Sequence, residues 1–277
     1  MFVNNYNSKV LYICRIITNQ RGRQMFIRNE SFRDFIRFYP VVTALVAIQL
    51  VVWLLVILGP GRPLFQMGAG VNLFIENGEY WRLITPIFLH DPNGVMHVLF
   101  NSFSLVLFGP ALEQMTGKLR FLLIYLLTGF AGNLFTFIVD PSAYYVHVGA
   151  SGAIYGLFGM YMYMVFFRKH LIDRANAQIV TTILIIGLIM TFLRPGINIL
   201  GHLFGFIGGL ALAPIFLNNV KPFAMWRNKR SRTQDGDIHF DPNRWNKRRI
   251  PWKKYLVPAL WVFIGLLVVL GVLGRFF

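Results

Sequence analysis

Cysteine and acidic residues are scarce in this chain. Of its 277 residues one is a cysteine, Cys14, which excludes an internal disulfide and a cysteine-ligated zinc cluster. The chain has 11 Asp and Glu residues, and none of its histidines lies in a His-Glu-x-x-His pattern. No acidic residue is placed to complete a zinc site with those histidines, so the sequence argues against a metalloprotease and predicts neither a metal site nor a cofactor.

Apolar residues are abundant instead. They make up 56% of the chain, and its mean hydropathy is +0.55. Soluble domains are roughly 45 to 50% apolar, so the composition predicts a membrane protein. The 27 Lys and Arg residues raise the pI to about 10.4, a value also found in nucleic-acid-binding proteins. Because the cytoplasmic loops of membrane proteins are rich in Lys and Arg, we expect no nucleic-acid partner.

Long apolar runs predict seven transmembrane helices and an all-α polytopic membrane protein. Most of the runs approach the ~20 residues that cross ~30 Å of hydrocarbon. The fifth, at about 16 residues, is the shortest. The runs cover about 40–59, 95–112, 119–139, 150–167, 178–193, 198–217 and 255–274.

The distribution of positive charge predicts the orientation. With the N-terminus inside, the only Lys and Arg residues outside are Arg62, Arg82, Arg194 and Arg275. This excess of inner charge predicts a cytoplasmic N-terminus in a cell membrane. The predicted parts are a basic cytoplasmic segment at 1–39, a six-helix core at 40–217, a basic cytoplasmic linker at 218–253 and an additional helix at 254–277. The linker either lies against anionic lipid headgroups or is solvated.

The first 29 residues contain several arginines and no acid, a composition that is also found in mitochondrial transit peptides. A second explanation is that translation begins at Met25, whose following residues run directly toward the first span. Both explanations remain open at this point.

Polar residues lie inside three of the predicted spans, where they are costly and often functional. His97 and Asn101 are four residues apart, on one face of the second span. Ser151 begins the fourth span and His202 lies near the start of the sixth. Each has a structural explanation as a helix-packing or helix-linking residue. Their common depth near the outer ends of three helices favours a hydrolase site within the bilayer.

The remaining histidines fall in predicted loops. His90 and His147 lie in outer loops, and His170 and His239 in inner ones. We expect all four to be solvated surface residues.

These patterns resemble the signatures of the rhomboid family of intramembrane serine proteases over about residues 40–217. The run from Gly149 to Gly152, with Tyr155 four residues after Ser151, is similar to the family's Gly-x-Ser-x signature. The other matching patterns are His97 with Asn101, His202 with Gly205 and Gly209, the pair Trp81-Arg82, and the Gly-xxx-Glu-xxx-Gly stretch of Gly109, Glu113 and Gly117.

The order of segments adds to the resemblance. A core followed by one extra helix is similar to the six-plus-one arrangement of some bacterial and secretory-pathway members. This order favours a bacterial plasma membrane over a mitochondrial location.

The resemblance implies an intramembrane serine endopeptidase with Ser151 as nucleophile and His202 as general base. A Ser-His dyad is favoured, because none of the acidic residues in the outer loops neighbours His202 in sequence. His97, Asn101 and the Ser151 backbone N–H are the expected donors to the oxyanion. The implied substrates are single-span membrane proteins, cut near the outer face.

Supporting roles are also expected. The Tyr155 ring would pack against the imidazole of His202, and Gly149 and Gly152 would allow close approach of the backbone. Small residues are expected to hold the fourth and sixth spans in contact, namely Gly152, Gly156 and Gly159 with Gly201, Gly205 and Gly209. Trp81 suits the membrane interface. Arg82 and Glu113 would each hold a loop in place, or are solvated charges.

Two other functions remain open. Polar residues inside the membrane are also typical of a small-solute transporter. The same scaffold could instead serve a noncatalytic chaperone of membrane proteins.

Overall fold

The computed structural model describes Met25, Phe26 and residues 30–224. Residues 1–24, the greater part of the predicted basic linker and the predicted helix at 254–277 lie outside the described residues. The described chain is helical and has one isolated bridge, between Gly70 and His147. Its elements are α2 (Phe32–Phe38), α3 (Pro40–Leu58), α4 (Arg62–Gly68), α5 (Asn72–Glu76), η1 (Tyr80–Leu83), η2 (Thr85–Phe88), α6 (Val95–Thr116), α7 (Lys118–Val139), α8 (Ser151–Phe167), α9 (Arg174–Leu193) and α10 (Ile199–Phe216).

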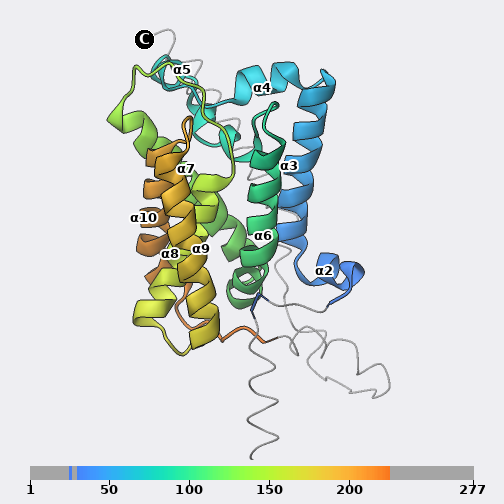
Figure 1. Cartoon of the computed structure of the whole chain (residues 1–277), viewed down its shortest axis with the longest axis vertical. Helices are drawn as coiled ribbons and strands as arrows, with labels where there is room; N and C mark the ends of the chain where they lie inside the picture. Colours follow the sequence, from blue (N-terminus) through green and yellow to red (C-terminus); the bar gives the residue numbers. More distant parts are fainter. Residues whose placement is uncertain (1–24, 27–29, 225–277) are drawn as a thin grey trace, which may run out of the picture.

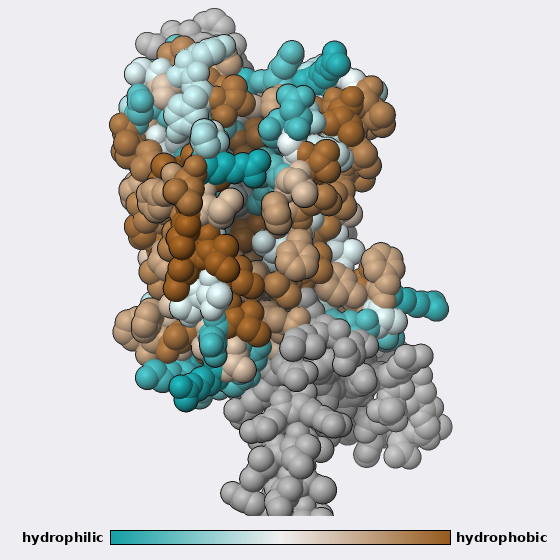
Figure 2. All heavy atoms as spheres, viewed as in Figure 1, coloured by the Kyte–Doolittle hydropathy of each residue, from teal (hydrophilic) through white to brown (hydrophobic). Residues whose placement is uncertain are grey.

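Six apolar helices form the body of the described chain (Figure 1). Helices α3, α6, α7, α9 and α10 are long and apolar enough to cross a membrane, and α8 is a shorter apolar helix of 17 residues. Figure 2 shows apolar side chains over the middle of the bundle and hydrophilic ones toward its two ends. The chain is therefore a multi-pass membrane protein with an all-α fold, as the sequence predicts.

One prediction about the spans is wrong. The fifth helix, α9, is not the shortest, because it begins at Arg174 and has 20 residues. The side chain of Asp173 accepts a hydrogen bond from the Asn176 backbone N–H at 2.9 Å and so caps the helix. The first turn of α9 is polar, and an apolar run therefore detects the helix only from its second turn. The shortest of the six is α8.

The tightest packing in the bundle involves α7, α8 and α10. These three helices contact one another more extensively than any other pair of elements does. Helix α3 packs mainly on α6, and in both α3 and α9 only 22% of the apolar window is buried within the protein. Helices α3 and α9 therefore turn most of their apolar surface toward lipid, while α8 lies in the interior of the bundle.

The end of α6 holds the start of α3. Glu113 is 2% exposed, and its two carboxylate oxygens accept hydrogen bonds from the backbone N–H groups of Val41 and Val42 at 3.0 and 2.9 Å. These N–H groups belong to the first turn of α3, which has no side-chain cap of its own. A carboxylate at a helix N-terminus is favoured by the helix dipole. Glu113 thus anchors a helix start, and it is neither a solvated charge nor bound to a loop.

The segment between α3 and α6 contains α4, α5, η1 and η2, and it covers one end of the bundle, which we call the α4–α5 end (Figure 1). Arg82 is buried there and donates to Glu79 at 2.7 Å and to the backbone carbonyls of Gln66 and Ala69 at 2.9 and 2.6 Å. The indole N–H of Trp81 donates to a carbonyl of α4 at 2.8 Å. Arg82 therefore holds this loop together, which is the role that the sequence predicts.

Candidate active site

The N-terminal ends of α6, α8 and α10 all lie at the α4–α5 end, because the six helices alternate in direction (Figure 1). His97 is the third residue of α6, Ser151 the first of α8 and His202 the fourth of α10. Three helices thus carry their polar side chains at one end of the bundle. The sequence likewise predicts that all three lie near the same ends of their helices.

The chain turns sharply just before Ser151. Gly149 has φ +131°, a conformation that favours glycine, and its N–H donates to the Pro86 carbonyl at 2.9 Å. A Cβ atom built on Gly149 would lie 2.7 Å from His97 Nε2 and 3.6 Å from Ser151 Oγ. His97 and Ser151 therefore both border Gly149, and a larger residue would collide with the imidazole.

The loop that leads to Ser151 is fixed by the segment between α3 and α6. Gly70 and His147 exchange two backbone hydrogen bonds, at 3.0 and 2.9 Å, and the Leu73 N–H donates to the Ala143 carbonyl at 3.2 Å. Together with the bond from Gly149 to Pro86, these contacts join the loop before α8 to the segment between α3 and α6. The position of Ser151 thus depends on backbone contacts far away in sequence.

His202 is 8% exposed and is held by two side chains. Its ring stacks on the Tyr155 ring with centroids 4.2 Å apart and planes 15° apart. Its Nδ1 lies 2.8 Å from Thr191 Oγ1, which is also 2.8 Å from the Tyr155 hydroxyl. The packing of Tyr155 on the imidazole is the contact that the sequence predicts, whereas the sequence gives no indication of Thr191.

Helices α8 and α10 approach each other through glycines. A Cβ atom on Gly205 would collide with the Gly152 backbone, and one on Gly209 with the Gly156 backbone. Such contacts let two helix backbones meet directly, as small residues do in membrane proteins. The glycines that the sequence predicts at this interface therefore do pack there, and Gly156 also faces Thr128 of α7.

The first turns of the two helices meet beside Ser151 and His202. A Cβ atom built on Gly152 would lie 3.2 Å from the Gly201 carbonyl oxygen. Ser151 directly precedes Gly152, and His202 directly follows Gly201. The crossing of α8 and α10 therefore places a hydroxyl and an imidazole on facing helix ends.

Asn101 lies one turn below His97 and is buried. Its side-chain amide donates to the His97 carbonyl at 2.8 Å. A carboxamide NH₂ group carries two hydrogens, so one remains for another acceptor. Asn101 is thus oriented along α6 by its own helix.

A family model described as the Rhomboid domain matches residues 77–219, just over half of the chain. The chain belongs to the rhomboid family. A protein of Bacillus subtilis named "Putative rhomboid protease YdcA" is 50% identical over 191 residues, which cover 68% of this rhomboid and 94% of that protein.

More distant relatives share only part of their length with this rhomboid. The rhomboid protease GluP of Bacillus subtilis is 37% identical over 172 residues, which cover 61% of this chain and 33% of GluP. The RHOMBOID-like protein 1 of Arabidopsis thaliana is 35% identical over 178 residues, which cover 63% of this chain and 44% of that protein. This rhomboid therefore matches less than half of the length of each of these two proteins.

Three residues that match the family's patterns, Trp81, Arg82 and Glu113, make structural hydrogen bonds in this rhomboid. Glu113 lies at the opposite end of α6 from His97. The hydrogen bonds of Trp81 and Arg82 go to the segment between α3 and α6. Trp81 and Arg82 thus hold the segment whose backbone also bonds the loop before Ser151, whereas Glu113 holds α3 to α6.

Two residues near His202, Asn198 and Thr191, are not predicted from the sequence. The Asn198 side chain caps α10 by accepting from the Gly201 N–H at 2.9 Å, and it also accepts from the Thr136 hydroxyl at 3.1 Å. An Asn just before an apolar run is a recognisable capping signal. Thr191 offers no such signal, because threonine is common inside membrane helices.

The prediction that His90 and His147 are solvated is wrong. They are 1% and 5% exposed, and His170 is exposed as expected. The His147 ring lies against the backbone of Gly70, in the segment between α3 and α6, and the His90 ring packs edge-on against His97 with centroids 5.2 Å apart. Burial lowers the pKa of His90 to about 3 and that of His147 to about 4. His239 lies outside the described residues.

Acidification is expected to destabilise this rhomboid partly through His147. An unfolded histidine binds a proton below a pH of about 6.5, whereas folded His147 does so only near pH 4. Between these values the unfolded chain gains protons that the folded chain does not, so the free energy of unfolding falls by up to about 1.4 kcal/mol per pH unit. Thermal midpoints in detergent at pH 7 and pH 4.5 measure this loss. His147→Gln should lose less than wild type, and equal losses would contradict the assignment.

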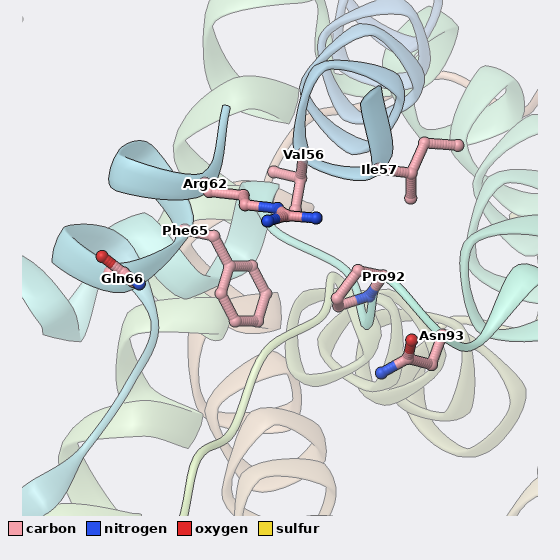
Figure 3. Close-up of a pocket in the computed structure, with 7 residues that line it drawn as sticks. All are labelled: Val56, Ile57, Arg62, Phe65, Gln66, Pro92 and Asn93. Carbon is pink, nitrogen blue, oxygen red and sulfur yellow. The ribbon is translucent and has the colours of Figure 1, made fainter. Parts of the chain in front are cut away.

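A pocket of about 340 Å³ opens elsewhere at the α4–α5 end (Figure 3). Val56 and Ile57 at the end of α3 line it, with three residues of α4 and the Pro92-Asn93 turn, and Phe65 faces Pro92 across it. No predicted catalytic residue lines it. Among the described residues, no group of three His, Cys, Asp or Glu side chains is arranged to hold a metal ion.

Proposed function

We propose that this rhomboid is an intramembrane serine endopeptidase, with Ser151 as nucleophile and His202 as general base. The observation that carries the proposal is the position of His202, stacked on Tyr155 beside the first turn of the helix that Ser151 begins. The relatives named as rhomboid proteases support the same reaction class.

In the proposed reaction, His202 Nε2 takes the hydroxyl proton of Ser151 while Oγ attacks the carbonyl carbon of the scissile peptide. The tetrahedral intermediate collapses when His202 returns that proton to the leaving amine. A water molecule, deprotonated by His202, then attacks the acyl-enzyme ester and releases the new carboxyl terminus and Ser151. One water is consumed and one peptide bond is broken.

The oxyanion of the intermediate needs donors that are in place beforehand. His97 is the best-supported one, because its Nε2 and Ser151 Oγ border the same glycine. Asn101 and the Ser151 backbone N–H are the other proposed donors. The start of α8 adds the positive end of a helix dipole, which favours negative charge at this position.

A dyad fits the surroundings of His202 better than a triad. Its Nδ1 lies next to the Thr191 hydroxyl, where a triad would have a carboxylate. The stacked Tyr155 ring restricts the rotation of the imidazole. The orientation of the base is therefore attributed to a hydroxyl and an aromatic ring.

We infer the surroundings of the reaction from the charge pattern. The N-terminus is placed in the cytoplasm and the α4–α5 end at the outer face of a bacterial plasma membrane. The proposed substrates are single-span membrane proteins that are cut near that face. The basic linker of residues 218–253, most of which lies outside the described residues, is proposed to bind anionic lipid headgroups.

The test uses the full-length chain, purified and reconstituted with a single-span substrate of known sequence. Wild type is expected to release two fragments whose mass places the cut near the outer face, and a serine-directed phosphonate is expected to label Ser151. Ser151→Ala should do neither. The control Ser142→Ala, at an exposed serine of the loop before α8, should behave as wild type.

The proposal fails if wild type leaves every single-span substrate intact, or if Ser151→Ala cuts as fast as wild type. Intact substrate with retained binding would favour a noncatalytic chaperone. Uptake of a small solute into the vesicles would favour a transporter.

A further inference from the structure

Thr191 occupies a position in the last turn of α9 where three polar groups converge. The side chain is 2% exposed. Its Oγ1 lies 2.8 Å from each of the Gly187 carbonyl, the Tyr155 hydroxyl and His202 Nδ1. A single hydroxyl thus joins α9 to the imidazole on α10 and to the phenol on α8.

The hydrogen count at this hydroxyl decides the direction of each bond. A threonine hydroxyl donates one hydrogen and accepts two, and a backbone carbonyl can only accept. With its hydrogen on the Gly187 carbonyl, Thr191 Oγ1 accepts from the Tyr155 O–H and from the His202 Nδ1–H. In a neutral imidazole, a proton on Nδ1 leaves the lone pair on Nε2.

The backbone of α9 is shaped for this contact. Gly187 lies one turn before Thr191, and a Cβ atom built there would lie 2.8 Å from the Tyr155 hydroxyl. Glycine at this position therefore lets the phenol reach Thr191 across the helix surface. The three-way contact is thus accommodated by both the side chain and the backbone of α9.

We propose that Thr191 is a positioning residue, which holds His202 in the tautomer whose Nε2 is the base for Ser151. This inference rests on the proposed function. When His202 takes the serine proton, its Nδ1–H remains hydrogen-bonded to Thr191 Oγ1. The imidazolium therefore keeps a hydrogen-bond acceptor at the position where a triad has a carboxylate. Tyr155 fixes the plane of the imidazole ring, and Thr191 keeps the proton of the neutral ring on Nδ1.

Thr191→Val removes the hydroxyl and keeps the shape of the side chain. It is expected to lower kcat by about ten- to a hundredfold with KM within about twofold of wild type, because the lost bond is made to a group that becomes charged. Thr191→Ser is expected to recover kcat to within about threefold of wild type. The matched control is Thr181→Val on the same helix, whose hydroxyl also bonds the carbonyl four residues earlier, at 2.8 Å, and which should leave kcat unchanged.

A second measurement reads the tautomer directly. The ring ¹⁵N resonances of His202, assigned by their loss in His202→Ala, are expected to show a protonated Nδ1 and an unprotonated Nε2 in wild type and Thr191→Ser. Thr191→Val should show a mixture of the two tautomers. A merely structural role for Thr191 would not change this signal.

Wild-type resonances with the proton on Nε2 would overturn the proposal, as would a Thr191→Val variant that keeps both the wild-type tautomer and the wild-type kcat. The tautomer does not depend on turnover. If the wild type cleaves no substrate, the proposed function fails, and the resonances still decide whether Thr191 fixes the imidazole.

Discussion

Ser151→Ala, His202→Ala and the double variant are each expected to lower kcat by about the same factor, on the order of 10⁴ to 10⁶. The serine hydroxyl is a weak nucleophile unless His202 takes its proton, and the imidazole has nothing to activate without the hydroxyl. Because each residue acts only through the other, removing the second costs little once the first is gone. Single-turnover cleavage of a fluorogenic single-span substrate in vesicles measures all three variants.

The control in this series is Tyr155→Phe, which keeps the ring stacked on His202 and removes the hydroxyl at Thr191. We expect it to lose no more than about tenfold in kcat, because the bond it removes is between neutral groups. Additive losses would show instead that Ser151 and His202 act independently. In that case, the two residues would not form a dyad, whatever the chain cleaves.

The sequence alone predicts the six described apolar helices and the clustering of His97, Ser151 and His202 at one end of them, because both follow from the pattern of apolar and polar residues along the chain. A run of about 20 apolar residues crosses a membrane, and residues four apart share a helix face. The second rule gave the stacking of Tyr155 on His202, since Tyr155 lies one turn below Ser151. The glycines of α8 and α10 were predicted to meet because membrane helices pack closely through small residues.

Contacts between elements far apart in sequence could not be predicted in the same way. Glu113 was recognised as a motif residue, yet its partners, the N–H groups at the start of α3, depend on how α3 packs against α6. The burial of His90 and His147 depends on contacts such as those with His97 and Gly70, which the polarity of a loop does not reveal. Thr191 is eleven residues before His202, and only the packing of α9 brings them together.

Gly205→Ala is expected to be the most damaging single methyl group that can be added to α10 near the site. Its Cβ would collide with the backbone of Gly152, which cannot rotate away as a side chain can. The two helices must separate, and overpacking of this kind costs about 1 to 3 kcal/mol or more. Since Gly152 directly follows Ser151, we also expect kcat to fall by about a hundredfold, as for other small displacements of reacting groups. Thermal midpoints and cleavage rates in detergent measure both effects.

The same substitution three residues later provides the control. A Cβ atom on Gly208 would have as its nearest neighbour the Ala131 side chain of α7, at 3.2 Å, and it would meet no atom of α8 within 4 Å. Gly208→Ala therefore adds the same methyl group to the same helix without entering the contact between α8 and α10. It should keep kcat within about twofold of wild type. If Gly205→Ala and Gly208→Ala have equal activity, close contact between α8 and α10 is not what positions Ser151 against His202.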